Sequence, residues 1–245
     1  MRLLSKLTLV ELKLFLREPL TVLFALALPL IVLFILGGVF GNEAQGEVYR
    51  GVGAMNYYVP AYVALVTASV GLISVPVHVA ESRERGVLRR FHASAVPVWA
   101  LLGAQVAVSM VIATVSSLLL VAAALPAYSA NGPDSLPPVV GAFVLNALAF
   151  GTFGVLLGSV LPTARAAQAL GILLWFVMLF LGGAGPPPEV LSDVLGAIGD
   201  VMPLTHAVAL MHEGWISLDA GSSLWVVAGM FVGSSALALR FFRWE

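Results

Sequence analysis

This sequence contains no cysteine and few charged residues. The absence of cysteine among its 245 residues excludes disulfide bonds, thiol catalysis and metal sites built on cysteine. Only 10% of the residues are charged, whereas a water-soluble domain carries about 25%. Hydrophobic residues make up 60% of the chain, and the mean hydropathy is +1.01. These proportions indicate an integral membrane protein, because too few charges remain to cover a surface in water.

The chain also lacks the features with which proteins bind nucleotides and nucleic acids. No G-x-x-x-x-G-K-[ST] motif is present, since the last lysine is Lys13, so the chain by itself has no P-loop for ATP phosphates. No basic stripe indicates nucleic-acid binding. We therefore expect no cofactor bound by this chain and no nucleic-acid partner.

Catalytic and metal-binding patterns are weak as well. His206 and His212 with Glu213 suggest a zinc site, but a helix places two ligating histidines four residues apart rather than six. Ser109 and Ser159 lie in apolar runs without a G-x-S-x-G motif. We expect neither a metal site nor a catalytic residue, so the chain is not predicted to be an enzyme.

Six long apolar runs predict an all-α membrane protein with six transmembrane helices, residues 1–245 forming one transmembrane domain. About 20 residues at 1.5 Å per residue cross a hydrocarbon core of about 30 Å. The predicted spans are residues 20–40, 57–80, 98–125, 139–161, 167–182 and 224–242. No Asp, Glu, Lys or Arg lies in the middle of any of them, which argues against a proton-coupled pump or an ion channel with a buried carboxylate.

Residues 1–19 are too polar to span the membrane and predict an amphipathic interface helix. An apolar stripe recurs at helical spacing, with basic residues off it that can face anionic headgroups of membrane lipids. The stripe holds Leu3, Leu7, Val10 and Leu14, and the basic residues are Lys6, Lys13 and Arg17. A signal peptide is the alternative, but the apolar run that follows is longer than an h-region and no A-x-A site comes after it.

Residues 183–221 interrupt the pattern of long spans. The segment opens with Gly-Ala-Gly-Pro-Pro-Pro-Glu and continues as a semi-polar stretch. One helical face holds Val190, Leu191, Val194, Leu195 and Ile198, with Asp193 and Asp200 off that face. We expect short extracytoplasmic helices here that lie on the membrane surface or re-enter it before the last span.

The most charged part of the chain follows the second predicted span. Residues 81–97 read ESRERGVLRRFHASAVP and hold six charged residues, of which the whole chain has 12 basic and 13 acidic. A solvated loop that obeys only the positive-inside rule would not need Glu81 and Glu84. We therefore favour a short element that docks another protein over a bare loop.

Basic residues are distributed unevenly between the two sides that six spans define. One side holds eleven of them: Arg2, Lys6, Lys13, Arg17, Arg83, Arg85, Arg89, Arg90, Arg165, Arg240 and Arg243. The other side holds only Arg50, together with eight acids: Glu43, Glu47, Asp134, Glu189, Asp193, Asp200, Glu213 and Asp219. The positive-inside rule then places both termini and residues 81–97 in the cytoplasm of a multi-pass cell-membrane protein.

Small residues recur four positions apart in three places. The pairs are Gly37 and Gly41, Ala100 and Ala104, and Gly154 and Gly158. Such spacing lets helix backbones approach closely in lipid. We favour packing within the chain, with a dimer face as the alternative.

Taken along its length, this pattern resembles the permease subunits of the ABC type-2 transporter family. The most telling stretch is Arg83-Glu84-Arg85-Gly86-Val87-Leu88-Arg89-Arg90 with the later Pro97, and the second is Pro203-Leu204-Thr205-His206. The resemblance covers nearly the whole chain, although its motifs are short. Many members place the proline about two residues sooner after the basic run than Pro97 stands here.

The resemblance implies a membrane subunit that pairs as a dimer, a homodimer or a pairing with a similar second permease. It also implies docking of two copies of an ATP-binding subunit, which holds the ATP and Mg. The coupling helix would be 81–97, with Glu81, Arg83, Glu84, Arg85, Gly86, Val87, Leu88, Arg89 and Phe91 at the docking site. We expect Val87, Leu88 and Phe91 to form an apolar knob and Gly86 to allow close approach or a bend. The interface helix would contribute Lys6, Val10, Lys13, Leu14 and Arg17, and the extracytoplasmic cap Pro186, Pro203, Thr205 and His206.

The function implied is ATP-driven export of a hydrophobic or amphipathic substrate such as a drug, a lipid or a lipid-linked glycan. The alternative is a self-sufficient secondary carrier or a membrane-embedded lipid-modifying enzyme. That alternative requires polar groups at mid-membrane or a catalytic constellation, and neither is evident in the sequence.

Overall fold

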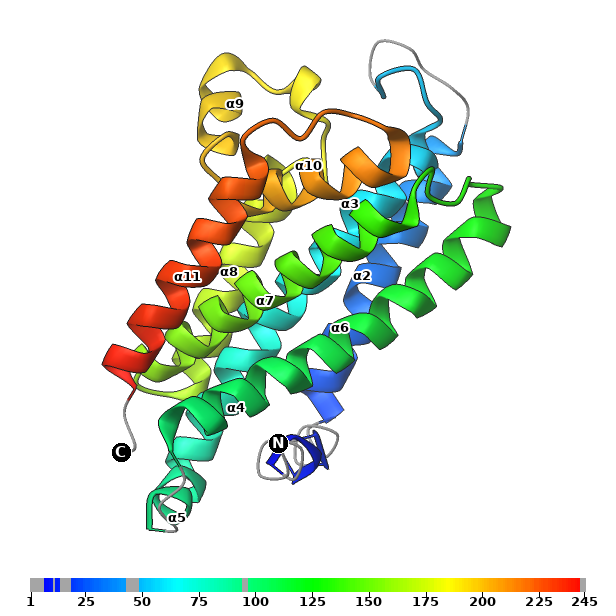
Figure 1. Ribbon diagram of the computed structural model, residues 1–245. Helices are drawn as coiled ribbons and strands as arrows, with labels where there is room; N and C mark the ends of the chain where they lie inside the picture. The colour runs from blue at the N-terminus through cyan, green and yellow to red at the C-terminus, as the bar shows by residue number, and fades with distance from the viewer. Residues whose placement is uncertain (1–6, 11, 14–18, 43–48, 94–96, 243–245) are drawn as a thin grey trace.

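The computed structural model describes residues 7–10, 12–13, 19–42, 49–93 and 97–242, and the regular elements among them are helices. Long helices run in alternating directions between two ends of an elongated bundle (Figure 1). The elements are α2 (Pro19–Phe40), α3 (Ala54–Ser69), the π-helical turn η1 (Val70–Ser74), α4 (Val75–Glu84), α5 (Val87–Ala93), α6 (Val98–Tyr128), α7 (Leu136–Val160), α8 (Ala164–Leu181), the 3-10 turn η2 (Pro188–Val190), α9 (Asp193–Gly199), α10 (Pro203–Ile216) and α11 (Ser223–Phe241).

Among the described residues, five helical segments are long and apolar enough to cross a membrane. They are Ala54–Glu84, Val98–Tyr128, Leu136–Val160, Ala164–Leu181 and Ser223–Phe241. The pair α9 and α10 is bent by 79° and adds a sixth only if it counts as one broken span. Within α2, which has 22 residues, Pro29–Val39 is a shorter apolar helix. The all-helical prediction is confirmed with five to six candidate spans, and the assignment of six spans with α2 as the first stays a prediction.

The two ends of the bundle carry different elements. Figure 1 shows α5 at one end, together with the last turn of α11, whereas α9 and α10 lie at the opposite end. We call these the α5 end and the α10 end. The predicted coupling helix and the predicted cap therefore lie at opposite ends of the long helices.

The segment Ala54–Glu84 forms the centre of the bundle. It comprises α3, η1 and α4, and its most apolar 18-residue window is completely buried. Helices α2, α6, α7, α8 and α10 all contact it. A helix that is apolar on every side is stable only inside a larger assembly, and the surrounding helices provide that environment here.

A proline explains the π-helical turn in this central segment. Pro76 has no N–H, so it cannot donate the α-helical hydrogen bond to the carbonyl of Leu72, four residues earlier. The backbone widens instead, and the N–H of Val75 bonds to the carbonyl of Val70, five residues back. Such π-turns relieve local strain in a helix, and they also change which carbonyls face the neighbouring helices.

Neighbouring helices approach the π turn through glycine. A Cβ added to Gly154 of α7 would lie 2.0 Å from the carbonyl oxygen of Gly71, and one added to Gly171 of α8 would lie 2.0 Å from that of Leu72. A Cβ on Gly158 would meet Val79 and Pro76 at 2.7–2.9 Å. The Gly154 and Gly158 pair therefore packs within the chain, as predicted.

Three side-chain hydrogen bonds reinforce the central segment and the helices around it. Trp175 of α8 is buried and donates its Nε1–H to Ser69 Oγ at 2.6 Å, while the Ser69 hydroxyl donates to the carbonyl of Leu65. Asn146 of α7 donates to the carbonyl of Ala207 in α10 at 3.0 Å. The buried N–H donors of Trp175 and Asn146 are thereby paired where no water is available.

We predict that Gly154→Ala destabilises the bundle, because the new methyl group overlaps the Gly71 carbonyl. Overpacking of this kind costs about 1–3 kcal/mol. Thermal unfolding of the detergent-solubilised protein should show a clearly lower midpoint. Gly141→Ala on the same helix is the control, since its Cβ meets nothing within 4 Å. Equal midpoints for the two variants would contradict the proposed backbone contact.

Candidate functional site

The candidate docking site is the α4–α5 corner at the α5 end. Helix α4 ends at Glu84, and the turn that follows is closed by hydrogen bonds from the N–H of Arg85 to the carbonyl of Glu81 and from that of Gly86 to Arg83, both 2.9 Å. Gly86 has φ +70°, which a residue with a Cβ rarely adopts. The glycine therefore provides the bend that turns the chain from α4 into α5.

Arg83 caps the end of α7. Its guanidinium donates to the carbonyl of Gly158 at 3.0 Å, to that of Ser159 at 3.2 Å, and to that of Leu161. The last carbonyls of a helix have no partner within it and carry partial negative charge. A guanidinium is suited to this position because its planar fork offers several donors at once.

Glu84 caps the start of the next helix. Its Oε1 accepts a hydrogen bond from the N–H of Ala164 at 2.9 Å, and Thr163 Oγ1 accepts from the N–H of Ala166 at 3.1 Å. The first N–H groups of α8 carry partial positive charge, so a carboxylate stabilises them. Arg83 and Glu84 are adjacent in sequence and bind the two ends of the α7–α8 turn. The positive side chain lies at the C-terminus of α7, and the negative one lies at the N-terminus of α8.

The side chains of α5 divide into an inner and an outer set. Leu88 is 2% exposed, and Phe91 packs against the cluster of Leu7, Ala100 and Ala104. Both therefore contact the chain itself. Val87, the third residue of the expected apolar knob, is half-exposed. Arg85, Arg89 and Arg90 are exposed.

The remaining predicted residues at this end are one ion pair of the docking site and the residues of the interface helix. Arg85 forms an ion pair with Glu81 at 2.8 Å, one helical turn away. Leu7 of the predicted interface helix is buried, whereas Val10 and Lys13 are exposed. Lys6, Leu14 and Arg17 lie outside the described residues.

The predicted cap residues join three helices at the α10 end. Pro203 is the first residue of α10, a position where its missing N–H costs nothing. Thr205 Oγ1 donates to the carbonyl of Gly199 at 2.5 Å. The Nε2 of His206 lies 3.0 Å from the carbonyl oxygen of Asp200. Because a carbonyl oxygen can only accept a hydrogen bond, this nitrogen carries the proton. The Nδ1 of His206 lies 3.1 Å from Ser223 Oγ of α11.

Metal binding finds no support among the described residues. No group of three His, Asp or Glu side chains is close enough there to hold a metal ion. His206 bonds as above, while His212 is buried and its Nε2 donates to the carbonyl of Tyr57 at 2.9 Å. The two histidines serve separate contacts.

An aromatic cluster at the α10 end was not anticipated as a unit. Tyr58 stacks on Tyr62 with ring centroids 5.5 Å apart, and Tyr49 packs edge-on to Tyr58 at 5.7 Å. Burial raises the pKa of Tyr49, so its hydroxyl stays protonated. The i, i+4 spacing of Tyr58 and Tyr62 is the sequence feature that indicates contact between these two rings on one helix face.

This cluster lines an apolar groove between α2 and α8. The groove has a volume of about 430 Å³. Its walls are Val32, Ile35, Tyr49, Tyr58, Leu179, Phe180, Gly185, Pro186, Pro187 and Val190. The predicted cap residue Pro186 therefore lies at this groove, apart from Pro203, Thr205 and His206.

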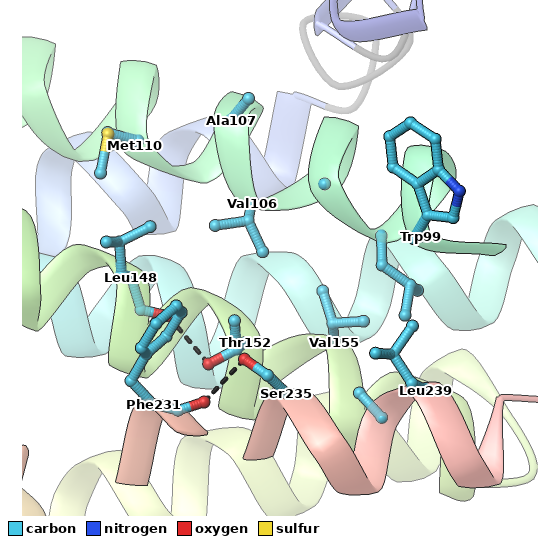
Figure 2. A pocket seen from close by; sticks show the side chains of 13 residues that line it. Trp99, Val106, Ala107, Met110, Leu148, Thr152, Val155, Phe231, Ser235 and Leu239 are labelled. Carbon is cyan, nitrogen blue, oxygen red and sulfur yellow. Dashed lines mark hydrogen bonds between the residues drawn. The ribbon is translucent and has the colours of Figure 1, made fainter. Parts of the chain in front are cut away.

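A second groove, of about 400 Å³, lies between α6, α7 and α11 toward the α5 end (Figure 2). It is bordered by Trp99, which is 62% exposed, and its lining is almost entirely apolar. Thr152 Oγ1 donates to the carbonyl of Leu148 at 2.9 Å, and Ser235 Oγ to that of Phe231 at 2.6 Å. Both hydroxyls are paired within their own helices, so the groove suits a purely apolar chain.

We predict that Arg83→Met destabilises the folded protein by about 1.5–3 kcal/mol, because it removes charge-assisted hydrogen bonds from carbonyls that then have no partner. Arg85→Gln is the matched control. It removes an exposed i, i+4 ion pair, worth about 0.3–0.5 kcal/mol. Chemical unfolding in detergent measures both. A loss for Arg85→Gln as large as that for Arg83→Met would contradict the capping role.

Comparison with known proteins agrees with the resemblance. The family model described as "ABC-2 type transporter" matches residues 2–214. The chain is 25% identical over 190 residues to the probable multidrug ABC transporter permease YbhR of Escherichia coli K12, a match that covers 75% of this chain and 51% of that protein. The protein of the same name from Escherichia coli O157:H7 matches equally.

The chain spans about half the length of these curated relatives. Since the family model covers most of the sequence, the chain belongs to the ABC-2 type transporter family, as a membrane-spanning permease.

Proposed function

We propose that this chain is the membrane subunit of an ATP-driven exporter, which moves a hydrophobic or amphipathic substrate such as a drug, a lipid or a lipid-linked glycan. A separate ATP-binding subunit would hydrolyse the ATP. Family membership supports the transport role, and the name of the relatives supports a drug among the substrate classes.

The observation that carries the proposal is the attachment of α5 to the bundle. The corner carries exposed arginines, yet it is fixed by the two caps from Arg83 and Glu84 and by buried Leu88. A force applied to α5 from outside is therefore delivered to the α7–α8 turn and to the central segment. This is the mechanical property that a coupling element needs.

The proposed docking surface is the outer set of α5 and the preceding turn. Arg85, Arg89 and Arg90 provide positive charge for acidic residues of the partner, and Val87 adds apolar contact. Arg83, Glu84 and Leu88, which the sequence analysis also assigned to the docking site, would hold the element in place through their contacts with the bundle. Gly86 sets its angle.

Orientation follows from the charges at the two ends. The α5 end carries Arg83, Arg85, Arg89, Arg90, Arg165 and Arg240, whereas the α10 end carries Arg50 with several acids. The positive-inside rule then places the α5 end in the cytoplasm, where ATP is available. The groove between α2 and α8 is apolar and suits a place where two copies of the chain meet around a substrate path.

A self-sufficient carrier is less well supported. Such a protein couples transport to ions through ionisable groups at mid-membrane. Among the described residues, the long helices carry their Asp, Glu, Lys and Arg side chains only near their ends. The exporter-subunit proposal needs no such group.

We predict that Arg89→Glu releases the ATP-binding subunit from the membrane chain. Charge reversal at a polar contact costs binding through repulsion as well as through the lost attraction. The measurement is co-purification of candidate ATP-binding subunits with the tagged chain, together with the ATPase rate of the complex.

Arg240→Glu is the control for this experiment, because Arg240 is an exposed arginine at the same end but on α11. It should retain the partner. Loss of the partner from both variants would point to a general charge effect, and retention by both would contradict docking at α5. Transport by the purified chain without ATP would overturn the proposed function as a whole.

A further inference from the structure

A small polar pocket lies at the α10 end, where α10 meets the start of α3. Its volume is about 80 Å³, roughly the space of two to three waters at about 30 Å³ each. Two exposed residues with opposite charges line it, Arg50 from the turn before α3 and Asp219 from the loop after α10. The rest of its polar lining consists of Tyr57, Thr205 and His212. A molecule that enters this pocket from the surface therefore meets a positive group and a negative group.

Arg50 is isolated from the other basic residues of the chain. It is the only lysine or arginine between Arg17 and Arg83, and none occurs between Arg165 and Arg240. The positive-inside rule predicts few basic residues on the side that we propose to lie outside the cytoplasm. Arg50 is therefore the residue at this end that can hold an anionic group by charge.

The backbone at Arg50 is strained. The N–H of Val52 donates to the carbonyl of Tyr49 at 3.1 Å, which closes a tight turn with φ +52° at Arg50 and +87° at Gly51. Two positive φ angles are typical of a type I′ turn, in which Asn, Asp or Gly is strongly preferred at the first central position. Strained residues of this kind cluster at ligand sites, where the surrounding structure holds them in place. The turn thus brings an arginine to the pocket in spite of an unfavourable backbone conformation.

The wall formed by α3 and α10 is fixed by internal contacts. His212 Nε2 donates to the carbonyl of Tyr57 at 2.9 Å, and the centroids of the two rings lie 4.5 Å apart. Both side chains are buried. This part of the pocket is therefore formed in advance and needs little ordering when a ligand binds, which favours affinity.

The charged and polar groups of the pocket complement a ligand that carries both charges. The Arg50 guanidinium has five N–H donors, so it can bind a carboxylate and keep a further contact. Asp219 Oδ1 accepts from the N–H of Gly221 at 2.8 Å, and a carboxylate accepts at both oxygens. The hydroxyl of Thr205 donates its proton to the carbonyl of Gly199, so toward a ligand its oxygen only accepts. Asp219 and Thr205 are therefore acceptors for an ammonium group.

We propose that this pocket binds a small amino acid as its zwitterion, with glycine as the simplest example. The carboxylate of the ligand lies on Arg50, and its ammonium group lies beside Asp219 and the Thr205 oxygen. The volume limits the ligand to the size of the smallest amino acids. A simple anion is repelled by Asp219 and a simple cation by Arg50, so the pocket favours the zwitterion over both.

This site goes beyond the proposed function, because it lies at the α10 end, apart from the proposed docking surface on α5. Binding is measured on the full chain without an ATP-binding subunit. A failure of docking at α5 and a failure of binding at this pocket can therefore be told apart.

The test is saturation-transfer difference NMR of the full chain in phosphatidylcholine nanodiscs, titrated with glycine, glycolate or ethanolamine. Glycolate keeps the carboxylate but has a hydroxyl group in place of the ammonium, and ethanolamine keeps the ammonium but has an alcohol in place of the carboxylate. Empty nanodiscs give the background signal of each compound. Glycine should bind at least about fivefold more tightly than either of the others, because each of these lacks one charged contact.

Three variants test the residues of the pocket. Arg50→Asn removes the guanidinium and keeps the turn, because asparagine adopts positive φ readily. It should weaken glycine binding at least about fivefold and leave ethanolamine binding no weaker. Asp219→Asn keeps an oxygen for the N–H of Gly221 and should weaken glycine binding about threefold without weakening that of glycolate. Ala209→Leu enlarges a residue of the wall, fills the space and should weaken glycine binding at least about tenfold.

Asp134→Asn and Ala197→Leu are the matched controls, because both are exposed positions at the same end that do not line the pocket. Both should bind glycine as the wild type does. Circular dichroism and gel filtration check that each variant is folded. A glycine signal equal to that of empty nanodiscs, or glycine binding no tighter than that of glycolate, would overturn the proposal, as would unchanged glycine binding by Arg50→Asn.

Discussion

The arrangement of this bundle depends on how closely helix backbones can approach the buried segment Ala54–Glu84. In lipid, helices gain little from the hydrophobic effect on associating, so close packing and internal hydrogen bonds must hold them together. At the π turn, Gly154 and Gly171 bring α7 and α8 against the carbonyls of Gly71 and Leu72. Helix α7 in turn contacts α10 and α11, so these two glycines position much of the molecule.

The same central segment connects the α5 end and the α10 end. At the α5 end it supplies Arg83 and Glu84, which hold the α7–α8 turn with opposite charges. At the α10 end, the carbonyl of Tyr57 in its first turn accepts a hydrogen bond from His212 Nε2. In the proposed transport cycle, a displacement of α5 would therefore be carried through α4 to the α10 end. The π turn between these ends is the place where the helix departs from regular geometry, and such turns are frequent at functional sites.

The sequence predicted the helices well and their contacts poorly, for physical reasons. Length and apolarity along the chain decide whether a segment can span a membrane, and these were visible in five of the predicted spans. Helix α4 nevertheless runs on to Glu84 instead of ending near Ala80, because its charged residues are satisfied by α7 and α8. Those partners lie 75–80 residues away along the chain, so the residues near α4 do not indicate them. Leu88 could not be assigned to the inner side of α5 for the same reason, whereas the bend at Gly86 follows from a local backbone preference and was anticipated.

The central claim is that α5 is the part of the chain that receives the ATP-binding subunit. Because the sequence has no cysteine, a single cysteine can carry a photo-cross-linker without background labelling. We would place it at Val87→Cys on α5 and, for comparison, at Leu224→Cys at the opposite end of the bundle. Illumination of the reconstituted complex should cross-link the ATP-binding subunit to position 87 and leave position 224 unreacted with it. Cross-linking at 224 but not at 87 would show that the ATP-binding subunit does not dock on α5.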